Sequence, residues 1–332
     1  MTVPTPRSPR PVAMVLGGSR GLGLLLAREL GTRGYDLAVV ARSPDGLDAA
    51  RSDLEATGAT VVTLPADLSS RAEAEACVDA VARTFSRLDV VVANAGIIQV
   101  APLRSITATE VVEAHDAIFW SAVFPVLHAV EVMRRLHGEG RQGPGRVAVI
   151  TSIGGKVPTP HLLPYTAAKF ATVGFAESLR TEVAKDGISV TTVVPGLLRT
   201  GSPRNAHVGG AAEAEYRWFT VLDSIPVLAM DAERAARRIV SATLARRGEV
   251  VLTPLAKIGL RVHGLAPAVT TAALALVDRV LPDPGADGDR PAPAHELREQ
   301  PRWFRLLTTL TGRAADRHRE YDDETPGSRT GR

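Results

Sequence analysis

The stretch VAMVLGGSRGLGLLL, residues 12–26, decides the fold of this 332-residue chain. It begins with a continuous apolar run, as in a parallel strand that is buried on both faces. The glycine-rich turn 17–23 follows, and three leucines, 24–26, open a helical pattern. Glycines let the backbone turn tightly and approach a pyrophosphate, whose charge is stabilised at a helix N-terminus. The stretch therefore predicts a strand, a phosphate-binding turn and a helix. A plain strand-to-helix connection is the alternative.

Further short apolar runs alternate with longer segments of 3.6-residue periodicity. They lie at residues 37–41, 61–64, 90–93, 147–150, 190–194 and 250–252. Continuous Val, Ile and Leu runs are typical of buried parallel strands, and their alternation with helices indicates an α/β protein. We therefore expect a Rossmann-type, doubly wound parallel sheet of about seven strands with helices on both faces. This catalytic domain would span residues 12–254, after a flexible segment 1–11.

A serine, a tyrosine and a lysine have the spacing of a proton-transfer site. Tyr165 stands thirteen residues after Ser152 and four before Lys169. Residues four apart on a helix share one face. A tyrosine titrates near pH ~10, so its use near neutrality requires a fixed positive charge, which Lys169 can supply. Alternatively, Tyr165 and Lys169 are an ordinary helix-surface pair and Ser152 is a strand-end hydroxyl that bonds to nearby backbone.

The glycine spacing G-x-x-x-G-x-G, taken with Ser152, Tyr165 and Lys169, resembles the short-chain dehydrogenase/reductase family. Further motifs occur in the family's order over about residues 12–253. These motifs are Asp67-Leu68, Asn94-Ala95-Gly96, and Pro195-Gly196 with Thr200. The resemblance implies cofactor contacts from these residues, from Tyr165 and Lys169, and from the turn residues Gly17, Ser19, Arg20, Gly21, Leu22 and Gly23.

The resemblance also implies a reaction. Tyr165 would be the general acid in carbonyl reduction and the base in alcohol oxidation, Ser152 would bind the carbonyl oxygen, and Lys169 would lower the tyrosine pKa and bind the nicotinamide ribose. We therefore expect an NAD(P)-dependent oxidoreductase. The alternative is a catalytically silent dinucleotide sensor or partner-binding module, because a fold alone does not prove activity.

Charge predicts the cofactor. An NAD enzyme usually has an acid after the second strand, whereas this chain has Ala41 followed by Arg42. Arg20 adds a second cation within the turn, and two guanidinium groups suit a 2′-phosphate. We expect NADP(H) rather than NAD(H). The alternative is that Arg42 and Arg20 are only solvated charges on the surface.

Two positions depart from the family pattern. Phe119 aligns with an Asn that supports a proton relay to the lysine, and Leu16 replaces the usual Thr before the first glycine. The relay is therefore in doubt, and Phe119 is expected to be a core or subunit-contact residue. His115 and Ser121 are candidate substitutes to which no role is assigned.

Substrate specificity is expected in a lid at residues 196–230. Its apolar members are Leu197, Leu198, Trp218, Phe219, Leu222 and Ile225. They indicate a small hydrophobic carbonyl or alcohol substrate, unless they only pack the lid itself.

The C-terminal part is expected to be an extension of the catalytic domain. Residues 255–281 form an apolar helical segment that contains Pro267, and their charge-free run 264–277 is too short to span a bilayer. We expect this segment to pack on the domain or on a neighbouring subunit, or to lie on a membrane surface through Lys257 and Arg261. The tail 282–332 is expected to be disordered apart from a short helix around residues 303–310.

Composition excludes several classes. The net charge is +3, and acidic and basic residues are interspersed, so no nucleic-acid partner is expected. Cys77 is the only cysteine and has no metal-ligand partner pattern, so we expect no disulfide, no metal and a cytoplasmic, reducing location. The start of the chain predicts a strand rather than a signal peptide. The family resemblance suggests a homodimer or homotetramer.

Overall fold

Parallel strands form the central sheet of the computed structural model, which describes residues 10–225, 228–282, 290–297, 300–301, 303–304 and 308–320. Within this part of the chain the sheet has seven strands in the order β11-β7-β6-β4-β1-β2-β3. The strands are β1 (Val12–Leu16), β2 (Asp36–Ala41), β3 (Val61–Pro65), β4 (Val90–Ala93), β6 (Arg146–Ile150), β7 (Ser189–Val194) and β11 (Glu249–Val251). Each predicted apolar run lies in one of these strands, and the predicted Rossmann-type fold is confirmed.

The strand order places the ligand-binding edge. β1 pairs with β2 on one side and with β4 on the other, so the connections leave in opposite directions between β1 and β4. In an open α/β sheet, ligands bind at the carboxyl ends of the strands beside such a reversal. The glycine turn follows β1 and therefore lies at this edge.

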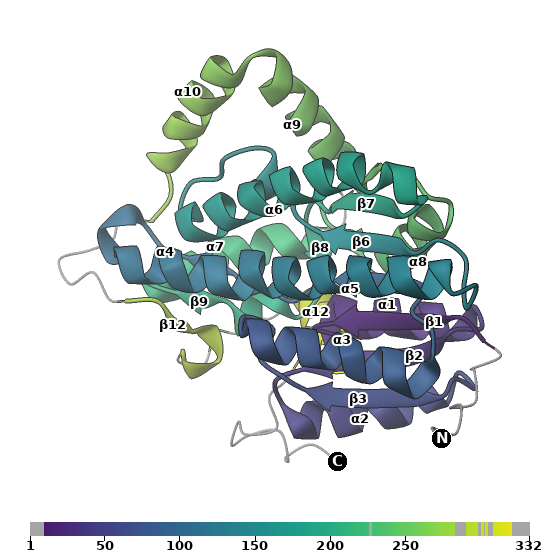
Figure 1. The fold of residues 1–332 in the computed structure, drawn as a ribbon. Coiled ribbons are helices and arrows are strands. Elements are labelled where there is room, and N and C mark those ends of the chain that lie inside the picture. The colour runs from purple at the N-terminus through teal and green to yellow at the C-terminus, as the bar shows by residue number, and fades with distance from the viewer. Residues whose placement is uncertain are drawn as a thin grey trace, which may run out of the picture.

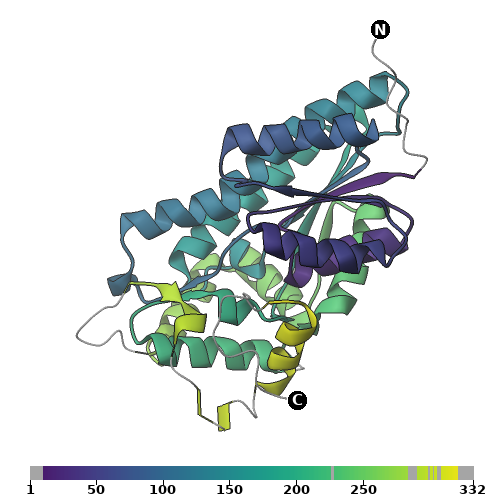
Figure 2. The same cartoon turned by 90° about the horizontal axis from the view of Figure 1, so that it is seen from below.

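Helices cover both faces of the sheet (Figures 1 and 2). One face carries α3 (Arg71–Phe85), α5 (Ser121–Gly138) and α6 (Leu163–Glu182). The other face carries α1 (Gly21–Thr32), α2 (Pro44–Glu55) and α8 (Ala232–Leu244). Successive residues of β1 alternate between the two cores: Met14 packs into the first and Val15 into the second. Both side chains are fully buried, as the continuous apolar run predicts.

Beyond the carboxyl edge, short elements form a cover. These elements are β5 (Gln99–Val100), α4 (Ala108–His115), β8 (Leu198–Arg199), β9 (His207–Val208), α7 (Ala212–Ser224) and β10 (Met230–Asp231), with the short helical turns η1 (Leu103–Ser105), η2 (Asp116–Trp120), η3 (Ile153–Gly155) and η5 (Ser202–Asn205). The turn η4 (Ala184–Asp186) lies at the opposite edge, between α6 and the start of β7. β10 pairs with β8, and β5 pairs with β9. The lid predicted at residues 196–230 therefore carries local structure of its own.

The tail differs from its expected disorder. Within its described residues, β12 (Ala292–Pro293) pairs with β9, η6 (Ala294–Glu296) follows, and α12 spans Thr309–Arg317. Of the helix predicted around 303–310, residues 303–304 are helical and residues 305–307 lie outside the described residues, while α12 begins at the end of this range. Its position is set by packing, because Ala315 is fully buried against the loop that follows β8.

Two helices, α9 (Pro254–Leu265) and α10 (Pro267–Asp278), form a hairpin that projects from the sheet domain (Figure 1). Pro267 begins the second helix, so the single predicted segment is two helices. Of the residues described in this hairpin, Ala256 alone is buried. The expected packing on the chain's own domain is therefore confined to the two ends of the hairpin, the start of α9 and Asp278 at the end of α10, which lies 3.4 Å from His161.

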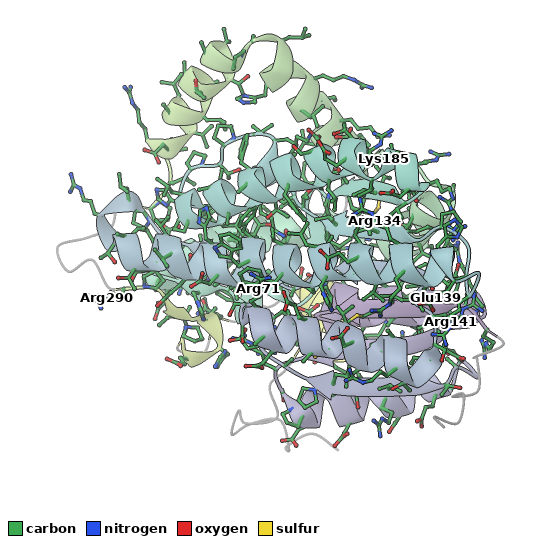
Figure 3. The ribbon with its side chains drawn as sticks, in the orientation of Figure 1. Arg71, Arg134, Glu139, Arg141, Lys185 and Arg290 are labelled. Atoms are coloured by element: carbon green, nitrogen blue, oxygen red, sulfur yellow. The ribbon has the colours of Figure 1, made fainter. Side chains whose placement is uncertain are left out.

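The described residues contain one helical stretch, Ala108–Gly138, with the length and apolarity of a membrane span. More than half of its most apolar window is buried inside the fold, as in a core helix. Charged side chains of both signs cover the outer helices (Figure 3). Arg134 on α5, for example, pairs with Asp186 at 2.6 Å.

Candidate active site

The glycine turn is held closely against the end of β4. Gly17 has φ +71°, and a Cβ atom there would lie 2.8 Å from the Ala95 Cα. Asn94 Nδ2 donates to the Gly17 carbonyl at 3.0 Å. A Cβ atom on Gly23 would lie 1.9 Å from the Gly17 oxygen, so that position also requires glycine. The predicted turn and the Asn94-Ala95-Gly96 motif therefore form one unit.

The turn leads into the N-terminus of α1, where a phosphate can bind. Gly21 begins the helix with φ +56°, and Arg20 stands at the N-cap position. Backbone N–H groups and the helix dipole at such an end favour an anion. Leu22 packs its side chain onto the core, and Leu16 is fully buried, so the usual Thr hydroxyl is replaced by apolar packing.

Arg42 and Asp67 lie at the ends of β2 and β3, where the adenosine half of a dinucleotide is expected. Hydrogen bonds from Ser69, with a smaller contribution from Arg42, lower the pKa of Asp67. Arg42 is exposed. A Cβ atom on Gly46, at the start of α2, would lie 3.7 Å from Ser19 Oγ, so Ser19 faces the same region. Leu68 is buried in the core, where its side chain supports the strand end.

The predicted Ser152, Tyr165 and Lys169 come together from two elements. Ser152 follows β6 and caps η3, where its Oγ accepts from the Gly154 N–H at 3.1 Å. Tyr165 and Lys169 lie on the first turns of α6. The Lys169 Nζ is 5.8 Å from the Tyr165 ring centroid and donates to the Ile150 carbonyl at 3.0 Å.

Burial controls the proton affinities of this site. It raises the pKa of Tyr165 to about 12; a hydrogen bond with Ser152 lowers that pKa, and Asp223 raises it. Burial likewise lowers the pKa of Lys169 to about 8. In this structure loss of water penalises the phenolate and the Lys169 ammonium bonds to a backbone carbonyl, so the acidification of Tyr165 by Lys169 stays a prediction for the site with its cofactor bound.

Phe119 packs among aromatic side chains, as expected of a core or subunit-contact residue, and does not lie beside Tyr165. Ile118, which is 1% exposed, packs against Tyr165, whereas Phe119 contacts the rings of Trp120 and Phe175. The chain forms a π-helical turn at η2, which shifts the helix by one residue. The side chain beside the catalytic pair is therefore aliphatic.

Neither candidate substitute for the relay turns toward Lys169. His115 Nδ1 contacts the Val111 carbonyl at 3.0 Å, and Ser121 Oγ donates to the Ala117 carbonyl at 2.7 Å. Both groups thus bond within their own helical stretch.

The loop after β7, where the resemblance leads us to expect the nicotinamide, lies against the Ser152 turn. The Pro195 carbonyl accepts from the Ile153 N–H at 2.7 Å, which joins this loop to the Ser152 turn. Gly196 packs closely against Thr253, and Thr200 is buried with its hydroxyl 2.5 Å from Ser202 Oγ.

Part of the predicted apolar lid packs internally. Phe219 is buried, and Trp218 packs in the same cluster, which also includes Tyr165. Leu198 joins the main core, and Leu197 and Leu222 are half-buried. Ile225 is 37% exposed. The aromatic part of the lid thus lies against Tyr165.

Three buried acids near the site were not predicted. Asp223 on α7 is 5% exposed, and burial, followed by Glu320, raises its pKa well above its ordinary range. Glu215 is fully buried and lies 2.7 Å from His161 Nδ1. An acid on the apolar face of α7 was a visible signal for Glu215 and Asp223. Glu320 comes from the distant tail, and no pattern in the sequence indicates which residues it contacts.

Comparison with known proteins gives the family. A model described as short chain dehydrogenase matches residues 11–207, more than half of the chain. The chain belongs to the short chain dehydrogenase family. It is 30% identical over 264 residues to a dehydrogenase/reductase SDR family protein 7-like from Anopheles gambiae, a match that covers 78% of this chain and 80% of that protein.

Solved structures agree with this membership. A 3-oxoacyl-[acyl-carrier protein] reductase from Brucella melitensis in complex with NAD has a TM-score of 0.63 and 26% identity, covering 73% of this chain and 95% of the other. An actinorhodin polyketide ketoreductase variant with NADPH has a TM-score of 0.63 and 25% identity, covering 75% and 97%. This short-chain dehydrogenase is therefore an NAD(P)-dependent dehydrogenase/reductase.

The residues present fit a nicotinamide dinucleotide. The turn approaches the start of α1 without side chains at Gly17, Gly21 and Gly23, so a pyrophosphate could come close to the backbone there, although in this structure the Gly21 N–H donates to the His318 carbonyl. Arg20 and Arg42 supply positive charge along the same edge.

Proposed function

We propose that this short-chain dehydrogenase uses NADP(H) to interconvert carbonyl and alcohol groups on hydrophobic substrates, with Tyr165 as the general acid and base. The observation that carries the proposal is the convergence of Ser152, Tyr165 and Lys169 beside the glycine turn. Separate elements bring these groups to one edge of the sheet, where the family binds its cofactor.

The bound nicotinamide supplies hydride to the carbonyl carbon. The Ser152 hydroxyl donates to the carbonyl oxygen and holds it beside Tyr165. With a pKa of about 12, Tyr165 is protonated at neutral pH and gives its proton to that oxygen as negative charge develops. The Lys169 ammonium stabilises the phenolate that remains and binds the ribose hydroxyls. Alcohol oxidation reverses these steps, with the phenolate accepting the proton.

The preference for NADP(H) rests on Arg42 and Arg20. Arg42 follows β2 at the place where an NAD enzyme usually has an acid, and it is exposed beside the strand edge. Guanidinium groups bind a 2′-phosphate bidentately, and this adds specificity as well as affinity.

A hydrophobic ketone is the proposed substrate. The aromatic cluster of Trp218 and Phe219 lies against Tyr165, so the substrate approaches an apolar surface. The similarity to a ketoreductase and to a 3-oxoacyl reductase supports a ketone as the reacting group. The alternative is a silent dinucleotide sensor, for which the aliphatic Ile118 beside Tyr165 and the departures at Phe119 and Leu16 are the indications.

The test is steady-state oxidation of NADPH and of NADH by the purified chain with a panel of apolar and polar ketones. We expect turnover of apolar ketones and a KM for NADPH about tenfold or more below that for NADH. Arg42→Ala should narrow this gap. A tenfold preference for NADH would overturn the cofactor assignment, and dinucleotide binding without turnover of any ketone would favour the sensor. We further propose that the protein is cytoplasmic and forms a homodimer or homotetramer. Light scattering would measure the mass of this assembly.

A further inference from the structure

The C-terminal segment 309–320 lies on the glycine turn. The Gly21 N–H, at the start of α1, donates to the His318 carbonyl at 2.9 Å. A Cβ atom on Gly21 would lie 2.7 Å from Glu320 Oε1. Both views of the ribbon place α12 beside α1 (Figures 1 and 2). A backbone carbonyl and a carboxylate therefore occupy the helix end at which a pyrophosphate would bind.

Specific contacts hold this segment in place. Ala315 is fully buried, and a Cβ atom on Gly201 would lie 2.6 Å from the Ala315 Cβ. Asn205 Nδ2 donates to the Glu320 carbonyl at 3.1 Å. Thr311 Oγ1 lies 2.6 Å from Ser224 Oγ, which joins α12 to the lid helix α7. The segment is docked on the cofactor side of the lid.

Glu320 presents a carboxylate to this site. It is 4% exposed, and among the described residues its Oε1 has no hydrogen-bond partner. Burial raises the pKa of Glu320 to about 7, and the Gly201 N–H and Arg20 lower it. The carboxylate thus interacts with Arg20, a cation that we assign to the dinucleotide.

We propose that residues 309–320 form an autoinhibitory segment that covers the dinucleotide site and must move away before a dinucleotide binds. The inference rests on the dinucleotide binding in the proposed function. It has two consequences. The apparent affinity for NADPH falls in proportion to the fraction of open molecules. NADPH binding also increases the exposure of the segment, because a ligand that binds only the open form shifts the population toward it.

Variants of the full chain test the first consequence, with fluorescence titration of NADPH as the readout. Ala315→Glu places an acid in the buried contact with Gly201 and should release the segment. Glu320→Arg places a cation beside Arg20 and should release it too. We expect both variants to bind NADPH about tenfold more tightly than the natural chain, as for a closed form about tenfold more populated than the open form. Asp316→Arg, the matched charge change on the exposed face of α12, should leave the Kd unchanged.

The pair of variants separates release from added charge. Tighter binding by Glu320→Arg alone would indicate only a new cation near the phosphates, and it would overturn the inference. Unchanged affinity in Ala315→Glu, with its fold verified by circular dichroism, would overturn it as well.

Limited trypsin digestion of the natural chain tests the second consequence without a substitution. Cleavage after Arg313 and Arg317, both in α12, should accelerate several-fold when NADPH is added. Protection of these sites by NADPH would contradict the inference. Neither assay needs a carbonyl substrate. If both give the expected result but the chain reduces no ketone, the autoinhibitory segment is supported and the proposed reductase activity is overturned. A chain that binds no dinucleotide in any variant would overturn both.

Discussion

Tyr165 and Lys169 share one face of α6, and burial moves their pKa values in opposite directions, to about 12 and about 8. Both groups still carry their protons at neutral pH, so the phenol is ready to act as an acid. In the proposed mechanism the Lys169 ammonium stabilises the negative charge that develops on the Tyr165 oxygen as the proton leaves.

The buried ammonium predicts a pH-dependent stability. Unfolded lysine titrates near pH ~10.4, so between about pH 8 and 10 the unfolded chain binds one proton more than the folded chain at this position. The free energy of unfolding should therefore rise with pH through this group, by about 2 kcal/mol over that window. Below pH 8, burying the charge costs stability.

Urea denaturation of the natural chain and of Lys169→Met at pH 7.5 and pH 10 measures this effect. As the pH rises from 7.5 to 10, the free energy of unfolding of the natural chain should increase by about 2 kcal/mol relative to that of Lys169→Met. A difference that stays constant with pH would show that Lys169 titrates normally.

At the scale of single residues, the sequence predicted the groups whose spacing is local. Tyr165 and Lys169 are four apart on one helix, and the turn residues follow one strand, so their proximity needs no tertiary information. The neighbour of the pair was misassigned, because a π-helical turn changes which residue of α4–η2–α5 faces Tyr165.

The helices and strands of the sheet domain were predictable because their burial is continuous. Each of the seven apolar runs matches a strand to within one residue at either end, since both faces of the sheet are covered. The lid was less predictable, because its helix α7 is stabilised by a polar pair. Glu215 on α7 binds both His161 and the Trp218 Nε1–H, and His161 has φ +61°.

Because Glu215 bonds to both His161 and Trp218, removing its carboxylate should cause a large loss of stability. Glu215→Ala leaves the His161 ring and the Trp218 N–H without their acceptor inside the fold, so we expect a loss of about 3 kcal/mol in the free energy of unfolding. Glu213→Ala, which removes an acid that is 45% exposed on the same helix, should cost less than about 1 kcal/mol. Chemical denaturation of both variants measures the contrast, and equal losses would exclude a special role for the buried acid.

For the whole molecule, the sequence predicted the fold class but not where the tail docks. The contact between Glu320 and Gly21 joins residues about three hundred positions apart, and no local pattern encodes it. For the α9–α10 hairpin the sequence predicted the helical structure. It did not predict that the hairpin projects from the domain, because that depends on the rest of the fold.

The hairpin exposes apolar and cationic side chains together. Leu265 is 89% exposed and Val269 is 67% exposed near its tip, while Lys257 and Arg261 are exposed on α9. We propose an anionic lipid surface as its partner, because apolar and cationic side chains occur together there. Asp278, the acid at the end of α10, already lies 3.4 Å from His161.

Flotation with vesicles that contain anionic lipid tests this surface. The natural chain should float with the vesicles, and the double variant Leu265→Asp with Val269→Asp should lose most of this binding. Leu103→Asp, at a position that is 67% exposed in η1, should still bind. A natural chain that stays unbound while the double variant shifts from dimer to monomer would assign the hairpin to a second copy instead.

The central claim is that Tyr165 gives the proton during hydride transfer. Single-turnover oxidation of NADPH by an apolar ketone, compared between the natural chain and Tyr165→Phe, tests it most directly. The account predicts a rate about 10²–10⁴-fold lower in the variant at saturating NADPH, because general acid catalysis is lost. Equal single-turnover rates in the two proteins would contradict it.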